Sequence, residues 1–294
     1  MAEEASDRKQ FFRRLRKGVQ TEQTEMSFMD HLEALRWHIM RSVLVWLSAA
    51  ITIFVFIDWV FENIILAPSS QSFITYGTLC RFGRWLGVGD SLCMPPVKIR
   101  FLVTEVNGTF TSAINIAMVG GVILAFPYIF WELWRFVTPA LSNKERKYAR
   151  GSIFWVSLCF FTGAAFGYYL LAPFTFNFLA TFTLGKSGAI QYQPNITDYI
   201  DSLTNLILGC GIAFELPILA YVLAKIGLIT ASFLKKYSKY AFVIILLIAA
   251  IITPSPDMTS QIIVALPLLL LYWISILLVA SVDRKKAKEE KEWS

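Results

Sequence analysis

The chain has 294 residues, of which 56% are hydrophobic, and its mean hydropathy is +0.55. This composition excludes an ordinary soluble domain of the same length, which would contain fewer apolar residues. The net charge of +6 does not indicate a nucleic-acid partner, because the basic residues flank apolar stretches. We therefore predict an integral membrane protein that binds no nucleic acid.

The N-terminal segment, residues 1–26, is basic but carries acids early and has no apolar core. It therefore does not have the pattern of a cleaved signal peptide. We predict that it is a solvated cytoplasmic tail.

Six apolar stretches follow, at about residues 38–57, 108–133, 152–174, 199–224, 240–252 and 261–280. About 20 apolar residues are needed to cross about 30 Å of hydrocarbon, and the first four stretches meet this length. The fifth has 13 residues and reaches only ~20 Å, so the bilayer must thin there or neighbouring helices must shield its ends. All six are predicted to be helical, because a backbone in lipid must form its own hydrogen bonds.

The charges give these six spans an orientation. If the connecting segments alternate sides, 22 of the 27 lysines and arginines fall on the side of the two termini. Basic residues near spans stay cytoplasmic. We therefore predict that both the N-terminus and the C-terminus are cytoplasmic.

The first external loop, residues 58–107, is long and rich in turns, and we expect it to form a structured cap. It contains Cys80 and Cys93, which either form a disulfide or remain two free thiols. Cys159 and Cys210 lie within spans, where we expect them to behave as small apolar residues. In the third span, Gly163 and Gly167 form a small-xxx-small pair that favours close helix packing.

Acidic residues within spans are costly and often functional. Glu215 lies about midway along the fourth span, two residues before Pro217, which is predicted to kink the helix. Its spacing leaves two interpretations open, a polar clasp between helices or a functional carboxylate. Glu132, near the cytoplasmic end of the second span, is predicted to pair with Arg135 at i+3.

No group of residues resembles a catalytic centre. His31 and His38 have no Cys, Asp or Glu at metal-ligand spacing, and no nucleophile stands beside them. We predict a protein that is not an enzyme and that has no cofactor or metal. Read alone, Glu145 is a surface acid between bases, and Asp257 caps a helix start after a tight hairpin.

Four segments, taken together, resemble the TatC family, the multispanning receptor subunits of the twin-arginine protein translocase. The first two are His31 to Arg36 and the stretch from Phe126-Pro127 to Glu145-Arg146. The others are Phe214-Glu215-Leu-Pro217 and Thr253 to Gln261, in the family's order.

The resemblance implies a six-helix concave cup over residues 27–282, with the last two helices short, followed by a charged cytoplasmic tail at 283–294. It also implies a receptor that binds twin-arginine signal peptides and exports folded proteins across the bacterial inner membrane. The expected partners are single-span subunits resembling TatA and possibly TatB, an oligomer in the lipid bilayer, and the proton gradient as energy source.

The resemblance also implies site residues. The signal-peptide site would comprise Leu32, Glu33, Arg36, Phe136, Pro139, Leu141 and Glu145. Glu215 and Gln261 would make polar contacts within the membrane, and Pro68, Pro127 and Asp257 would be structural. In one departure, the family's first-motif Glu falls at Ala34, and Glu33 precedes it.

An alternative from the residues alone is a proton-coupled transporter of small solutes that uses Glu215. The absence of internal repeats and of other mid-span charges counts against it.

Overall fold

The computed structural model describes residues 28–70, 73–85, 87, 100–137, 143–182, 193–253 and 258–293. This part of the chain is helical, with one isolated parallel bridge between Leu102 and Asn195 and no strand. The longer elements are α2 (Phe28–Val55), α4 (Ile74–Trp85), α5 (Gly108–Val137), α6 (Asn143–Phe166), α7 (Ala172–Thr181), α8 (Ile196–Ala213), α9 (Leu216–Ile226), α11 (Ser238–Ile252) and α12 (Met258–Trp293). The short elements are α3 (Ile57–Val60), η1 (Phe61–Ile65), η2 (Ala67–Ser69), η5 (Gly167–Leu171) and α10 (Ala231–Lys236).

Five helical segments are long and apolar enough to cross a membrane. They are Leu32–Val55, Gly108–Val137, Ile153–Thr181, Ile196–Ile226 and Gln261–Lys288. Ser238–Ile252 is a shorter apolar helix of 15 residues, which reaches only ~22 Å at 1.5 Å per residue. The predicted all-α, multi-pass membrane fold is confirmed, and the short fifth helix is present.

The prediction that both final helices are short is wrong for α12, which has 36 residues. The predicted domain boundary at residue 282 therefore falls inside a helix. The charged segment after Ser281 is rich in Lys and Glu, which are strong helix formers, so the helix continues past the apolar stretch. The continuation is anchored, because Asp283 accepts a hydrogen bond from the Ala231 amide (2.8 Å) and Lys286 donates one to the Ala224 carbonyl (2.9 Å).

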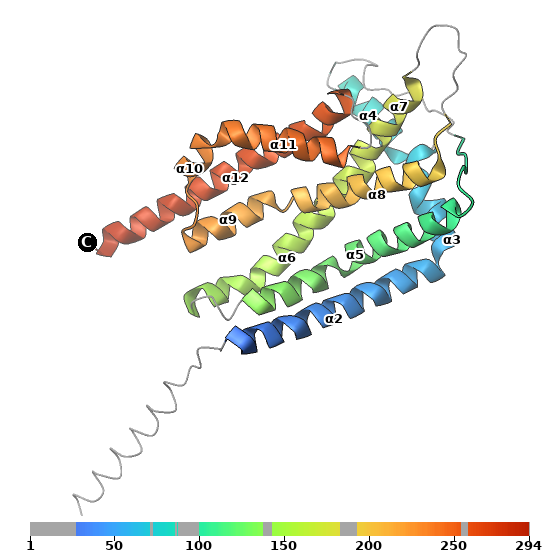
Figure 1. Cartoon of the computed structure of the whole chain (residues 1–294). Coiled ribbons are helices and arrows are strands. Elements are labelled where there is room, and N and C mark those ends of the chain that lie inside the picture. Colours follow the sequence, from blue (N-terminus) through green and yellow to red (C-terminus); the bar gives the residue numbers. More distant parts are fainter. Residues whose placement is uncertain are drawn as a thin grey trace, which may run out of the picture.

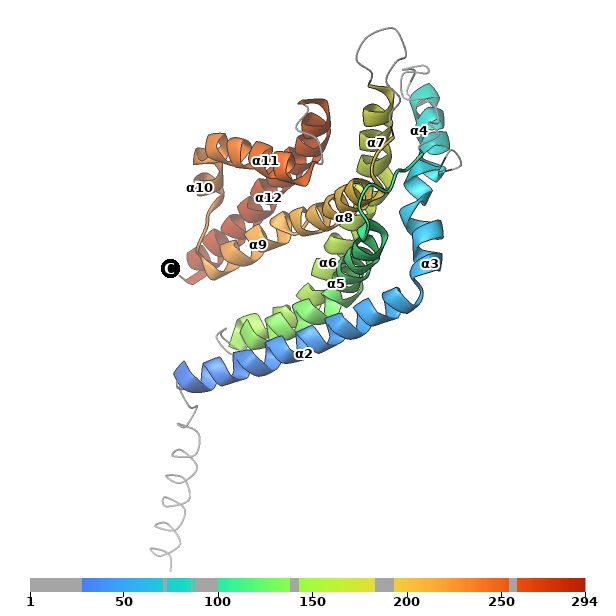
Figure 2. The ribbon, with the colours of Figure 1, turned by 45° about the vertical axis from the view of Figure 1, so that its right-hand side comes forward.

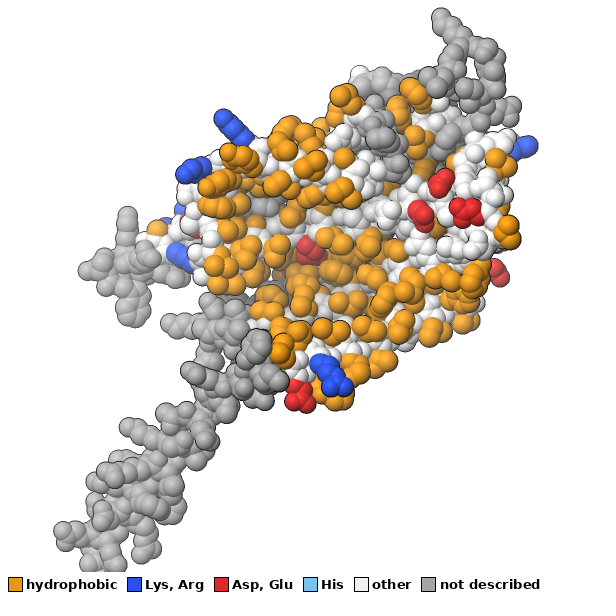
Figure 3. Space-filling model, in the orientation of Figure 1, with side chains coloured by type: hydrophobic (Ala, Val, Ile, Leu, Met, Phe, Trp, Pro, Cys, Tyr) orange, Lys and Arg blue, Asp and Glu red, His pale blue; other side chains and the backbone are white. Residues whose placement is uncertain are grey.

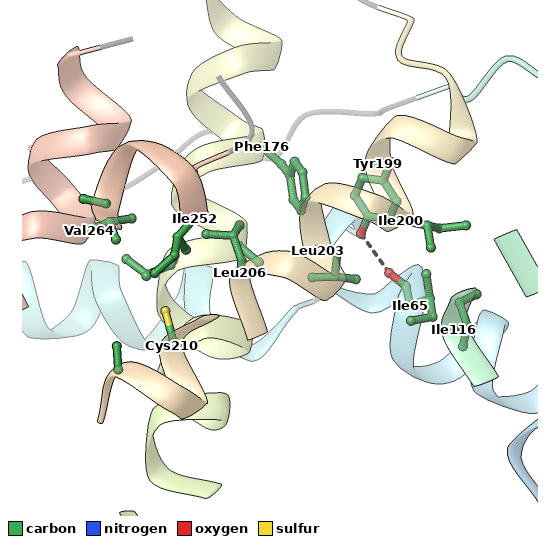
Figure 4. Close-up of a cluster of buried hydrophobic side chains, with 14 of the residues drawn as sticks. Ile65, Ile116, Phe176, Tyr199, Ile200, Leu203, Leu206, Cys210, Ile252 and Val264 are labelled. Atoms are coloured by element: carbon green, nitrogen blue, oxygen red, sulfur yellow. Dashed lines mark hydrogen bonds between the residues drawn. The ribbon is translucent and has the colours of Figure 1, made fainter. Parts of the chain in front are cut away.

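The core is built around α8, which packs against α5, α6 and α11. Its buried residues recur every three or four positions at Tyr199, Leu203, Leu206 and Cys210, the spacing of one helix face. Figure 4 shows these side chains among apolar residues of neighbouring elements, with the Tyr199 hydroxyl pointing at the Ile65 carbonyl. That hydrogen bond is 2.8 Å long and ties α8 to η1.

The glycines predicted to allow close packing lie where α6 and η5 meet α8. A methyl group on Gly163 would lie 2.5 Å from the Cys210 carbonyl oxygen, and one on Gly167 would lie 2.9 Å from that of Leu206. Backbones this close leave no room for a side chain. Two helices far apart in sequence are thereby held in direct backbone contact.

The segment predicted to form a cap folds into α3, η1, η2 and α4 at one end of the helices (Figure 1). Pro68 is buried in η2, and its carbonyl accepts a hydrogen bond from the Tyr76 hydroxyl (3.1 Å). Cys80 is disulfide-bonded, while Cys159 and Cys210 are free thiols. The expected partner, Cys93, lies outside the described residues.

The helices are arranged as two walls. In Figures 1 and 2, α2 lies along α5 on one side, and α9, α11 and α12 lie on the other, with α6 and α8 between them. Figure 3 shows the face between the walls as a hollowed, mainly hydrophobic surface. This is the concave shape that the sequence predicted.

Replacing Gly163 with alanine tests the α6–α8 contact. We expect Gly163→Ala to destabilise the protein by about 1–3 kcal/mol, because the added methyl group forces two backbones apart. The measurement is thermal unfolding of the purified protein in detergent. Gly77→Ala is the control, since nothing lies within 4 Å of that position. Equal midpoints for both variants would contradict the packing described here.

Candidate functional site: an apolar groove beside a break in the fourth span

The fourth span is interrupted at Phe214 and Glu215. α8 ends at Ala213 and α9 begins at Leu216, with the buried Pro217 in its first turn. Proline has no amide hydrogen to donate and its ring excludes the preceding helical turn. The predicted kink is therefore confirmed, and Glu215 lies at the break itself.

The two halves of the fourth span, on either side of the break, pack against different helices. Above it, α8 packs against α5 and α6; below it, α9 packs against α12. The aromatic ring of Phe160 on α6 lies against Gly211 of α8 and stacks on Phe126 of α5, with ring centroids 3.6 Å apart. The C-terminal half of the fourth span, α9, therefore belongs to the second wall, and the hollow of Figure 3 opens between the walls.

The Glu215 side chain is half-buried and within electrostatic reach of Cys159 on α6. Its Oε1 atom is buried and has no hydrogen-bond partner among the described residues. A buried polar atom without a partner costs free energy, and such groups gather at functional sites. The carboxyl group is therefore available to a polar group that enters the hollow.

The structure describes some of the predicted signal-peptide residues. On the first turns of α2, Leu32, Glu33 and Arg36 are exposed, and Ala34 is half-buried. Phe136, at the end of α5, makes an edge contact with the ring of His38, at 6.2 Å between centroids.

The other predicted residues of this rim are less fully described. The backbone of Glu145 belongs to the first turn of α6, but the position of its side chain is not among those that the structure describes. Pro139 and Leu141 also lie outside the described residues. The starts of α2 and α6 and the end of α5 meet at the same end of the molecule (Figure 1).

The predicted partner of Glu132 is wrong. Glu132 is buried, with 1% of its surface exposed, and its carboxylate accepts hydrogen bonds from His38 Nδ1 and from the Tyr128 hydroxyl (3.0 Å). The Arg135 guanidinium instead lies over the Trp131 ring, 5.7 Å from its centroid. Two residues at i and i+3 can pair only if both point along the same face, and Arg135 is exposed while Glu132 faces α2.

Sequence reasoning missed His38 as a partner, although one signal was present. His38 falls on the half-buried positions of α2, at the spacing Leu35, His38, Ser42, Val45 and Ala49. A lone histidine on a seam that is otherwise apolar or small requires a polar partner on the facing helix. That pattern predicts a partner for His38 but does not identify it.

The remaining predicted residues are Gln261, Pro127 and Asp257. Gln261 on α12 donates a hydrogen bond to the Leu246 carbonyl of α11 (3.0 Å). Pro127 lies within α5, which continues through it, and Asp257 lies outside the described residues. In the described part of the chain, no three His, Cys, Asp or Glu side chains gather as metal ligands would.

The same substitution at the two acids distinguishes their roles. Glu132→Met removes a fully partnered carboxylate and leaves His38 and Tyr128 unpaired, so we expect a loss of about 2–4 kcal/mol of folding free energy. Glu215→Met removes an unpartnered oxygen, so we expect the midpoint of thermal unfolding to rise by about 2–4 °C. The measurement is again unfolding in detergent. A loss of equal size at Glu215 would mean that its carboxylate is structural.

Comparisons with known proteins agree with this architecture. Residues 30–267 match the family of the Sec-independent protein translocase protein TatC. The chain is 38% identical over 269 residues to the TatC protein of Blattabacterium sp. subsp. Periplaneta americana, covering 91% of this chain and 100% of that protein. It is 46% identical over 182 residues to the TatC protein of Helicobacter pylori, covering 61% of this chain and 71% of that protein.

A crystal structure of the twin-arginine translocase receptor TatC superposes with a TM-score of 0.68 at 31% identity, covering 86% of this chain and 99% of that structure. The chain therefore belongs to the TatC family of Sec-independent protein translocase proteins.

Proposed function

We propose that this protein is the receptor that binds twin-arginine signal peptides and starts the export of the folded proteins that carry them. The observation that carries the proposal is Glu215, whose Oε1 atom is buried without a hydrogen-bond partner among the described residues, at the break in the fourth span. Figure 3 shows a hollowed, mainly hydrophobic surface between the two walls. The acids Glu33 and Glu145 would stand at the end of this surface. An amphiphilic peptide with a basic start and an apolar middle matches this order of surfaces. The solved structure that resembles this chain is of a twin-arginine translocase receptor.

The rim would recognise the arginine pair. The arginine guanidinium is planar and permanently charged, and it donates two parallel hydrogen bonds to a carboxylate. Glu33 is exposed at the start of α2, and Glu145 belongs to the first turn of α6. We assign the main contact with the arginine pair to Glu145. Glu33 would replace the glutamate that the family has at the position of Ala34. The apolar surroundings would be Leu32, Phe136, Pro139 and Leu141.

The groove would take the apolar part of the signal. A peptide helix inside the groove removes apolar surface from water and lipid headgroups, and its polar backbone or side-chain groups can reach Glu215. Binding there would supply a hydrogen bond to Oε1, which has no partner among the described residues. The protein acts by binding and assembly, and we assign it no catalytic role.

The remaining predictions from the sequence complete the proposal. The chain crosses the bacterial inner membrane six times, with α11 as the short fifth span and both termini in the cytoplasm. Single-span subunits resembling TatA, with or without TatB, join an oligomer around residues 27–282, and the proton gradient drives transport. Basic residues exposed at the start of α2 and along α10 and α12 support this orientation.

Peptide binding tests the receptor directly. We expect membranes containing the protein to bind a twin-arginine signal peptide at least tenfold more tightly than its twin-lysine counterpart, because lysine has no planar fork. Glu145→Gln should remove most of this preference, whereas Ala34→Glu should increase it. The measurement is titration of fluorescent peptides against proteoliposomes.

Equal binding of both peptides, unaffected by Glu145→Gln, would contradict the proposal. The transporter alternative would then be tested by solute-dependent proton flux into the same proteoliposomes. A receptor shows no such flux when it is the only protein present.

A further inference from the structure

A buried polar cluster joins α2 to α5 close to the proposed recognition rim. His38 of α2 donates from Nδ1 to Glu132, and the second carboxylate oxygen accepts from Tyr128 one turn earlier on α5. The two helices contribute residues 94 positions apart in sequence. Glu132 is 1% exposed and the His38 side chain 17%, so the contact is shielded from solvent.

This cluster matters because α2 has few other neighbours. The helix packs along α5 and meets α3 at its end, and it lies at the edge of the molecule in Figures 1 and 2. Toward the external end, the two backbones are in close contact, where a methyl group on Gly121 would lie 2.9 Å from the Ala50 amide nitrogen. Toward the rim, the seam residues are Leu35, His38 and Ser42, and among these His38 makes a polar contact with α5.

Apolar contacts tolerate sliding and rotation, whereas a hydrogen bond between two particular atoms does not. A single polar pair within an apolar helix seam is known to specify register. Successive residues of a helix point about 100° apart. A rotation of that size at the start of α2 would turn Glu33, which is exposed, to the direction that the half-buried Ala34 now has.

We propose that the buried cluster of His38, Glu132 and Tyr128 is a positioning clasp that fixes the rotation of α2 on α5 and so presents Glu33 and Arg36 to the signal peptide. The inference rests on the proposed receptor function. The three residues of the clasp would act on the signal peptide only indirectly, by positioning Glu33 and Arg36. His38 lies five residues from Glu33, about 7.5 Å along the helix. The clasp is near enough to set the direction of the first turns, and too deeply buried to touch the peptide itself.

The clasp predicts that stability and selectivity respond differently to one double variant. His38→Leu alone leaves the Glu132 carboxylate with one hydrogen bond instead of two, so it lowers both thermal stability and peptide selectivity. In His38→Leu/Glu132→Leu, an apolar pair fills the seam, so thermal stability returns close to that of the unchanged protein. The ratio of twin-arginine to twin-lysine binding should still fall about fivefold or more, because nothing then fixes the rotation.

Trp46→Phe is the matched control. It removes the other hydrogen bond between these helices, from Trp46 Nε1 to the Met118 carbonyl (3.0 Å), eight residues farther from the rim. Its selectivity ratio should remain within about twofold of that of the unchanged protein, while its stability falls. The experiment is titration of both fluorescent peptides against proteoliposomes of each variant, with thermal unfolding measured in parallel.

Two results would overturn the inference while leaving the receptor function standing. One is a double variant that keeps the full selectivity ratio, and the other is an equal loss of selectivity in Trp46→Phe. If the unchanged protein itself does not distinguish the two peptides, the receptor function fails instead. The binding of the unchanged protein therefore separates failure of the clasp from failure of the receptor.

Discussion

The break in the fourth span at Glu215 determines where the hollow lies. Pro217 cannot continue the hydrogen bonding of α8, so the chain changes direction and α9 packs on α12. α8 stays with α6 because Gly163 and Gly167 allow backbone contact that no larger residue would permit. The two halves of one span therefore belong to opposite walls. The break between them carries Glu215, whose Oε1 atom is buried without a hydrogen-bond partner among the described residues.

The two acidic residues within the apolar spans, Glu132 and Glu215, differ in their hydrogen bonding. Glu132 has both oxygens hydrogen-bonded, and its partners join two helices. Glu215 has a buried oxygen with no partner among the described residues. Because an unpartnered buried oxygen lowers stability, the fold bears a cost at Glu215 that it avoids at Glu132. This contrast favours a structural role for Glu132 and a binding role for Glu215.

The sequence predicts features that depend on local chemistry. The presence of the long apolar helices, the kink before Pro217 and the close packing at Gly163 all follow from neighbouring residues, and the structure confirms them. The partner of Glu132 did not follow, because it lies 94 residues away and depends on how α2 rotates on α5. The predicted length of α12 was too short because the helix was ended where the apolar stretch ends, whereas the following lysines and glutamates extend it. The roles assigned to Glu33, Glu145 and Glu215 stay predictions.

The most direct test of the groove uses the protein's own thiols. Cys159 is half-exposed within electrostatic reach of Glu215, whereas Cys210 is 1% exposed. A twin-arginine signal peptide with one cysteine in its apolar segment would be bound in membranes and oxidised. The account predicts a disulfide adduct that disappears in Cys159→Ser and is weak with a twin-lysine peptide. A bound peptide that forms no adduct with Cys159 at any position along its apolar segment would contradict it.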